Sequence, residues 1–139
     1  MNFESQTQRD CFERVRRWAD EMYDVEDVEL SLPSIRVIEG SAAVYISIIP
    51  FRDGDAWVEL SALVIRGVDL TQSLLQFLLR ENHGMRFAAL SLDAKDDVWL
   101  KRYLQGSTLD KVEFTDALIE IALSADKLDG VIKERWGGR

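Results

Sequence analysis

Two segments on either side of Asp53-Gly54 restrict the fold of this chain more than any other feature. Residues 44–49 and 57–64 place apolar side chains at every second position, the period of a β-strand with one buried face. Asp followed by Gly tolerates the positive φ angles of a tight hairpin turn. The sequence therefore predicts an antiparallel hairpin, whose second strand has one side made of Val58, Leu60, Ala62 and Val64 and the other of Trp57, Glu59, Ser61 and Leu63.

Three further segments have the three- and four-residue spacing of amphipathic helices. The first is residues 6–23. The second is residues 70–82, with Asp69 and Gln72 as an N-terminal capping box and Gly84 as the C-terminal stop. The third begins at a cap formed by Ser107 or Thr108 and runs to about residue 136. Because Gly in a helix costs about 1 kcal/mol relative to Ala, we expect a kink or break at residue 130.

The remaining elements complete an α+β pattern. Acidic residues crowd positions 20–29, which we interpret as an exposed linker, because like charges repel. A short strand is expected at 35–38, and a second hairpin from 85–93 and 98–104. The predicted order is helix, three strands, helix, two strands, helix (α-β-β-β-α-β-β-α), with one antiparallel sheet in a single domain over residues 1–139.

The charge of the chain excludes some classes of partner. Among 139 residues, 17 Lys and Arg face 25 Asp and Glu, for a formal net charge of -8. Nucleic acids and anionic membranes are bound through clustered cations, so we expect neither as a partner. No apolar run approaches the roughly 20 residues that span a bilayer, and we expect a cytoplasmic protein.

The residues of common catalytic and metal sites are scarce. The chain has one cysteine, Cys11, and one histidine, His83, so it has no internal disulfide and no zinc site built from Cys and His. Cys11 falls on the apolar side of the first helix, as inert buried thiols do, and His83 lies at the end of the second. The strand-to-helix junction at 66–69 has one glycine, too few for a phosphate loop. We therefore expect no enzyme, no cofactor and no metal.

The second helix carries more apolar residues than one buried stripe can use. One side can face the core, and the other must meet another element or a second subunit. We expect a homodimer whose subunit contact includes Leu74, Leu75, Phe77 and Leu78.

Aromatic side chains lie on the predicted strands, with Trp57 in the first hairpin and Trp99 and Tyr103 in the second. Trp99 and Tyr103 share one side of their strand. Large rings on a sheet face near solvent are typical of protein-binding surfaces, so we expect these three to bind a partner. Helices covering both faces of the sheet are the open alternative.

Several stretches resemble the YbjN family. They are 78–82 (LLREN), 87–93 (FAALSLD), Leu100, Leu104, Leu109-Asp110, 125–129 (ADKLD) and Trp136-Gly137. That family shares the fold of the type III secretion chaperones, whose element order is the order predicted above. The resemblance implies a small, often dimeric protein that holds an extended segment of a client against its sheet, or a regulator in stress and signalling responses.

Three hypotheses for function follow. The first is a non-enzymatic, dimeric protein-interaction module, either a regulator or a chaperone-like adaptor. The second is a small-ligand binding or enzymatic domain with a pocket between the sheet and the last helix, where Asp53, Asp55 or Asp93 would supply polar groups. The third is a structural subunit of a larger complex.

Overall fold

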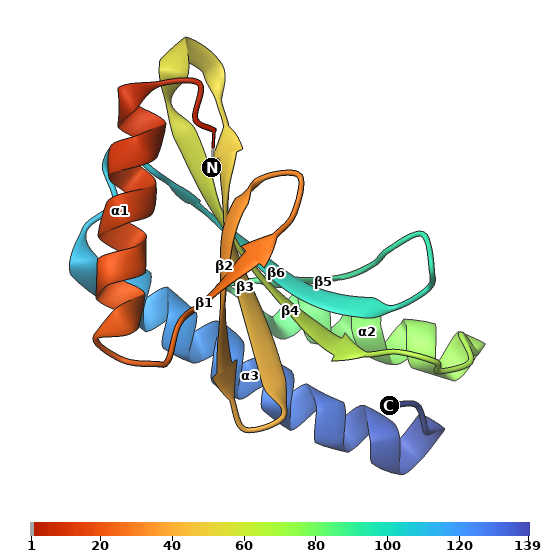
Figure 1. The fold of residues 1–139 in the computed structure, drawn as a ribbon. Coiled ribbons are helices and arrows are strands. Elements are labelled where there is room, and N and C mark those ends of the chain that lie inside the picture. The colour runs from red at the N-terminus through yellow and green to blue at the C-terminus, as the bar shows by residue number, and fades with distance from the viewer. Residues whose placement is uncertain (1) are drawn as a thin grey trace.

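The computed structural model describes residues 2–139 and contains three helices and one sheet (Figure 1). The helices are α1 (Gln6–Asp20), α2 (Gln72–Gly84) and α3 (Lys111–Trp136), with a 3-10 turn, η1 (Arg52–Gly54). The strands are β1 (Glu26–Glu29), β2 (Pro33–Glu39), β3 (Ala42–Pro50), β4 (Ala56–Ile65), β5 (Ala89–Leu92) and β6 (Val98–Gln105).

All neighbouring strands of the sheet are antiparallel, in the spatial order β1-β2-β3-β4-β6-β5. The α+β class is confirmed, and so is the predicted order of elements, to which the structure adds one short edge strand. The predicted hairpin turn is also confirmed, since Asp53 and Gly54 have φ angles of 59° and 74° between β3 and β4.

The additional strand, β1, lies in the acidic segment that we interpreted as a linker, and that interpretation was wrong for its second half. Backbone pairing with β2 places Glu26 opposite Arg36 and Asp27 opposite Ile35. Glu26 forms an ion pair with Arg36, and Asp27 forms one with Arg16 of α1. Tertiary ion pairs thus reduce the repulsion that the charge run would otherwise create.

The core lies between the helices and one face of the sheet, here called the inner face. Ile46 and Leu60 on this face are 0–1% exposed, as are Leu118 and Ile121 of α3, which crosses β2, β3, β4 and β6. α1 lies on the same side, with the Trp18 ring 5.9 Å from Phe114. The space between sheet and α3, where the second hypothesis required a pocket, is therefore filled by apolar side chains.

The helix ends differ from the predictions by a few residues. α1 ends at Asp20, three residues early, and Thr71 caps α2 in place of Asp69, accepting a hydrogen bond from the Leu74 backbone N–H at 3.2 Å. Asp110 caps α3 in place of Ser107 or Thr108. Ser, Thr and Asp are all good N-caps, so the sequence alone does not decide among neighbours.

α3 is one continuous helix through Gly130, so the predicted break was wrong. Burial explains the continuity. Leu128 and Ile132, on either side of Gly130, are at most 7% exposed and hold the helix on the sheet. Packing of this kind outweighs a propensity cost of about 1 kcal/mol.

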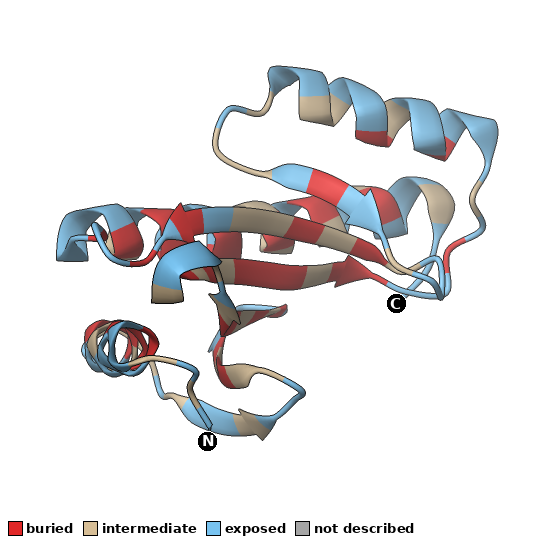
Figure 2. Cartoon of the chain, turned by 90° about the horizontal axis from the view of Figure 1, so that it is seen from above, coloured by how far each residue is buried: buried red, intermediate tan, exposed pale blue. Residues whose placement is uncertain are grey.

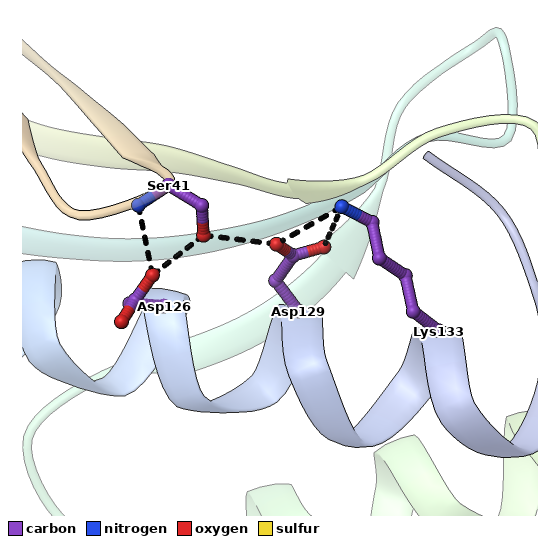
Figure 3. A network of polar contacts seen from close by, with 4 residues as sticks. All are labelled: Ser41, Asp126, Asp129 and Lys133. Carbon is purple, nitrogen blue, oxygen red and sulfur yellow. Dashed lines mark hydrogen bonds and ion pairs between the residues drawn. The ribbon is translucent and has the colours of Figure 1, made fainter.

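A polar network joins α3 to the turn between β2 and β3 (Figure 3). The Ser41 backbone N–H donates to Asp126 Oδ1 at 2.9 Å. The Ser41 hydroxyl lies 2.5 Å from Asp126 Oδ1 and 2.9 Å from Asp129 Oδ2, so its one hydrogen is shared between the two carboxylates. Lys133 pairs with Asp129 at 3.3 Å. These contacts fix the far end of the β2–β3 hairpin against the helix.

None of the helices in residues 2–139 combines the length and the apolar composition needed to cross a bilayer.

Candidate protein-binding surface

The second face of the sheet, here called the outer face, lies opposite α1 and α3. Strand register aligns its side chains in rows across the sheet. One row is Ser34, Ser47, Glu59 and Tyr103, and the next is Arg36, Tyr45, Ser61 and Lys101. In these rows Tyr103 is 50% exposed, whereas Ser34, Ser47 and Ser61 are buried, so part of this face is accessible to a partner.

The structure places the three predicted partner-binding residues on this outer face. Trp99 and Trp57 are half-buried, and Tyr103 is 50% exposed. Gln105, the residue opposite Trp57, lies six positions after Trp99 along β6, a span of about 20 Å at 3.3 Å per residue. The three side chains therefore extend along the face and do not form one compact cluster.

Trp99 borders a hollow of 780 Å³ on the outer face. Tyr45, Ser47, Glu59 and Ser61 line it from β3 and β4, and its other walls come from loops that include Leu30, Asp93, Asp97 and Lys95. The C-terminal residue Arg139 also lines the hollow, because its backbone pairs with that of Arg66 through two hydrogen bonds of 2.8 Å. The hollow is the recessed part of the outer face.

The Trp99 ring is held in position by its neighbours. Its Nε1–H donates to Asp93 Oδ2 at 2.8 Å, and its ring lies 6.1 Å from that of Tyr45. The Trp99 hydrogen bond, together with those from the backbone N–H groups of Asp97 and Lys95, holds the pKa of Asp93 below its ordinary value. Trp99 therefore presents a rigid aromatic edge to the hollow.

Tyr103 lies opposite Glu59, on the strand between β4 and the edge strand β5. A hydrogen bond with the Glu59 carboxylate, with partial burial and the charge of Glu59, raises the pKa of Tyr103 to about 12. The phenol therefore stays neutral and donates to Glu59. Trp57 lies apart from both, with its ring 4.9 Å from Phe51.

Tyr45 and Glu59 belong to this surface but were not among the predicted site residues. The alternation already placed Glu59 on the side of Trp57. What the alternation did not supply was the strand pairing, which brings Glu59 beside Tyr103 and Tyr45 beside Ser61.

The four residues expected in a subunit contact do not share a surface. Leu74 and Leu78 are 0% and 6% exposed and belong to the core of the single chain. Phe77 is half-buried, with its ring 5.1 Å from that of Trp136. Leu75 is 37% exposed and Leu79 is 69% exposed (Figure 2 shows most of α2 exposed). The accessible apolar part of α2 is therefore Leu75 with Leu79.

Of the candidate catalytic groups, Cys11 and Asp55 lie near each other, whereas His83 lies at the end of α2. Cys11 is fully buried, and burial raises the pKa of its thiol against the opposing effect of Arg14. His83 is exposed in the last turn of α2. Asp55 accepts hydrogen bonds from the Ser107 hydroxyl at 2.8 Å and the Ala56 backbone N–H at 2.7 Å, which gives it a structural role.

The fold is that of the type III secretion chaperones. The chain superimposes on one chain of the crystal structure of the ExsC–ExsE complex with a TM-score of 0.62 and 17% identity, over 94% of this chain and 96% of that one. It superimposes on the Yersinia pestis type III secretion chaperone SycH, solved with a fragment of YscM2, with a TM-score of 0.56 and 19% identity, over 85% and 98%. A third match is the HopA1–SchA chaperone–effector complex, with a TM-score of 0.55 and 15% identity, over 87% and 94%.

No curated protein matches the sequence. The model of one protein family does match, over residues 10–139. This match agrees with the resemblance noted above and covers the sheet and α3, together with all but the first residues of α1. The chain belongs to the family of T3SS (YopN, CesT) and YbjN peptide-binding chaperones, TY-Chap1.

Proposed function

We propose that this protein is a non-enzymatic, chaperone-like adaptor or regulator that binds an extended segment of another protein on the outer face. The observation that carries the proposal is the sheet face opposite α1 and α3, where Trp99 lines the 780 Å³ hollow and Tyr103, 50% exposed, lies opposite Glu59 of the same hollow. Membership of a peptide-binding chaperone family supports it, as do fold neighbours solved in complex with another protein, one of them a chaperone–effector complex. A cytoplasmic location remains part of the same proposal.

Added-strand binding at the β5 edge of the sheet is disfavoured by Asn82. Its side-chain amide donates to the Leu90 carbonyl at 3.1 Å and accepts from the Leu90 N–H at 2.6 Å. The amide thus occupies the backbone groups that an incoming strand would use. We therefore assign the client to the outer face and not to this edge.

The proposal is tested by selecting peptides from a random displayed library and titrating a selected peptide into purified variants by calorimetry. Tyr103→Ala and Trp99→Ala are expected to weaken binding by about tenfold or more, because aromatic anchors dominate such interfaces. Val112→Ala, which removes an exposed apolar side chain of α3, is the control. Equal affinity in all variants, or no selected peptide, would count against an outer-face site and favour a structural subunit.

We further propose that two copies associate through Leu75 and Leu79 of α2. These are exposed apolar residues one helical turn apart, and two such leucines on one side are typical of helix–helix contacts. Light scattering is expected to show a wild-type dimer and a Leu75→Asp monomer. Leu123→Asp, at an apolar position of α3 that is 53% exposed, is expected to leave the dimer intact. A monomeric wild type would end this part of the proposal.

A further inference from the structure

Two hollows meet at Arg86 and Phe87, in the loop before β5. The first, of 620 Å³, lies between α2 and α3, and the second, of 730 Å³, lies beside β5 and β6. Arg86 and Phe87 line both, so the two hollows form one continuous surface. We define the cationic surface by the basic residues that line it, Arg80, Arg86, Lys101, Arg102 and Lys127.

The charge of this surface is opposite to that of the molecule. Its five cations are accompanied by one carboxylate, Glu81, for a local charge of +4. Since the whole chain carries -8, the remaining residues carry -12. Within residues 2–139, none of the five cations has a carboxylate at ion-pair distance. The surface is therefore a localised positive field on an acidic protein, which attracts anionic groups.

Arg102 is the one of these five cations that has a buried side-chain nitrogen without an acceptor among residues 2–139. It is half-buried on β6, where Nη1–H donates to the Phe87 carbonyl at 2.9 Å and Nε is buried without a partner among residues 2–139. A guanidinium has five N–H donors and favours carboxylate acceptors. Arg102 is thus fixed against the Arg86–Phe87 segment with most of its hydrogen-bonding capacity unused.

Apolar side chains form the floor of the first hollow. Phe77, Phe87, Leu128 and Val131 line it, below Arg80 and Lys127. Phosphate-backbone binding depends on cations and needs no such floor, and the negative charge elsewhere on the molecule repels a long polyanion. A protein segment that combines carboxylates with apolar side chains matches both components.

A second copy related by a two-fold axis fits this surface poorly. A two-fold contact would bring the same patch of both copies together and so place like charges face to face. The contact through Leu75 and Leu79 proposed above does not occupy the cationic surface. Each of these residues is two positions from Phe77, about 200° around the helix, on the opposite side of α2.

We propose that the cationic surface binds an acidic segment of a protein partner, one in which Asp or Glu side chains are interspersed with apolar ones. The surface adjoins the outer face, because Tyr103 also lines the second hollow. A client that crosses the outer face and continues past β5 would reach it. The two surfaces share Lys101 and Tyr103, so the test uses Arg86 and Lys127, which are not part of the outer-face rows, and Trp99, which lines neither hollow of the cationic surface.

The test uses a fluorescently labelled peptide of Asp, Glu, Leu and Ser, and the same peptide with Lys at every acidic position. Fluorescence anisotropy with the full-length protein is expected to show binding of the acidic peptide alone, with affinity that falls as salt is added. Arg86→Glu and Lys127→Glu, both at exposed positions, are each expected to weaken binding on the order of tenfold. Arg17→Glu, exposed on α1, changes the net charge equally and is the control, expected to have little effect.

Several outcomes would overturn the proposal. Equal losses in Arg17→Glu and Arg86→Glu would assign binding to net charge alone, and equal binding of both peptides would remove the charge preference. Tighter binding of a single-stranded oligonucleotide would assign the surface to nucleic acid. Dissociation of a wild-type oligomer by Arg86→Glu would assign it to a second copy. Trp99→Ala is expected to retain acidic-peptide binding, so this proposal and the outer-face proposal can fail independently.

Discussion

Gly40 meets two constraints at one position of the β2–β3 turn. Its φ angle is 58°, in the left-handed region, which costs an L-residue about 1–2 kcal/mol. A Cβ atom built at Gly40 would also lie 2.8 Å from Asp126 Oδ1, the oxygen that accepts from Ser41. The Ser41–Asp126 contact that anchors the hairpin to α3 (Figure 3) therefore leaves no room for a side chain at residue 40 unless the Asp126 carboxylate moves.

Gly40→Ala is expected to destabilise the protein by more than the backbone cost alone, because the new methyl group would displace the Asp126 carboxylate. In an Asp126→Ala background the added cost should fall to about 1–2 kcal/mol. Urea unfolding of the four proteins in this double-mutant cycle measures the difference. An equal cost of Gly40→Ala in both backgrounds would show that the contact with Asp126 contributes nothing.

At the scale of elements, Gly130 is a position where tertiary packing outweighs low helix propensity. It is exposed in α3, and a Cβ atom there would have no heavy atom within 4 Å. Gly130→Ala is therefore expected to stabilise the protein by about 1 kcal/mol in thermal or urea unfolding. Gly106→Ala is the contrasting variant, since its Cβ would lie 2.9 Å from both the Ala56 carbonyl and Cys11 Sγ, and it should destabilise. Loss of stability in Gly130→Ala would indicate that α3 needs flexibility at this position.

The elements that the sequence predicts well are those whose pattern matches their burial. β4 alternates as predicted, with Val58 and Leu60 buried and Trp57 and Glu59 half-buried between them. β1 was not predicted, because Glu26–Glu29 has no alternating apolar side. The strand forms through pairing with β2 and through ion pairs to Arg16 and Arg36. Local composition cannot supply such tertiary contacts.

At the scale of the whole molecule, the surfaces depend on residues that are distant in sequence. The outer face follows from the alternation, which already placed Trp99 and Tyr103 on one side of a strand. The alternation does not predict the hollow on this face, because Leu30, Asp93 and Arg139 line it from segments that are distant in sequence. The cationic surface joins Arg80, Arg86 and Lys127 only because α2, the loop before β5 and α3 line the same hollow in the folded protein.

Three carboxylates join separate parts of the molecule and make it sensitive to acid. Asp126 links α3 to the β2–β3 turn, Asp93 holds Trp99, and Asp55 links the start of β4 to Ser107. Donation from the Ser41 hydroxyl and N–H holds the pKa of Asp126 below its ordinary value. At Asp55, burial raises the pKa, but hydrogen bonds from Ala56, Ser107 and Gln105 outweigh it and the pKa is lowered overall.

A lowered pKa in the folded state gives the sign of the pH dependence. The unfolded chain takes up protons near the ordinary Asp value of about 4, whereas the folded protein resists protonation until lower pH. The stabilisation from these carboxylates is therefore complete above about pH 4 and is lost as the pH falls through their folded pKa values.

The urea concentration at the midpoint of unfolding, measured from neutral pH downward, should therefore decrease below about pH 4. Asp126→Asn should flatten the fall, and Asp116→Asn, an exposed control on α3, should not. Identical pH profiles for wild type and Asp126→Asn would show that the Ser41 contact does not favour the charged carboxylate.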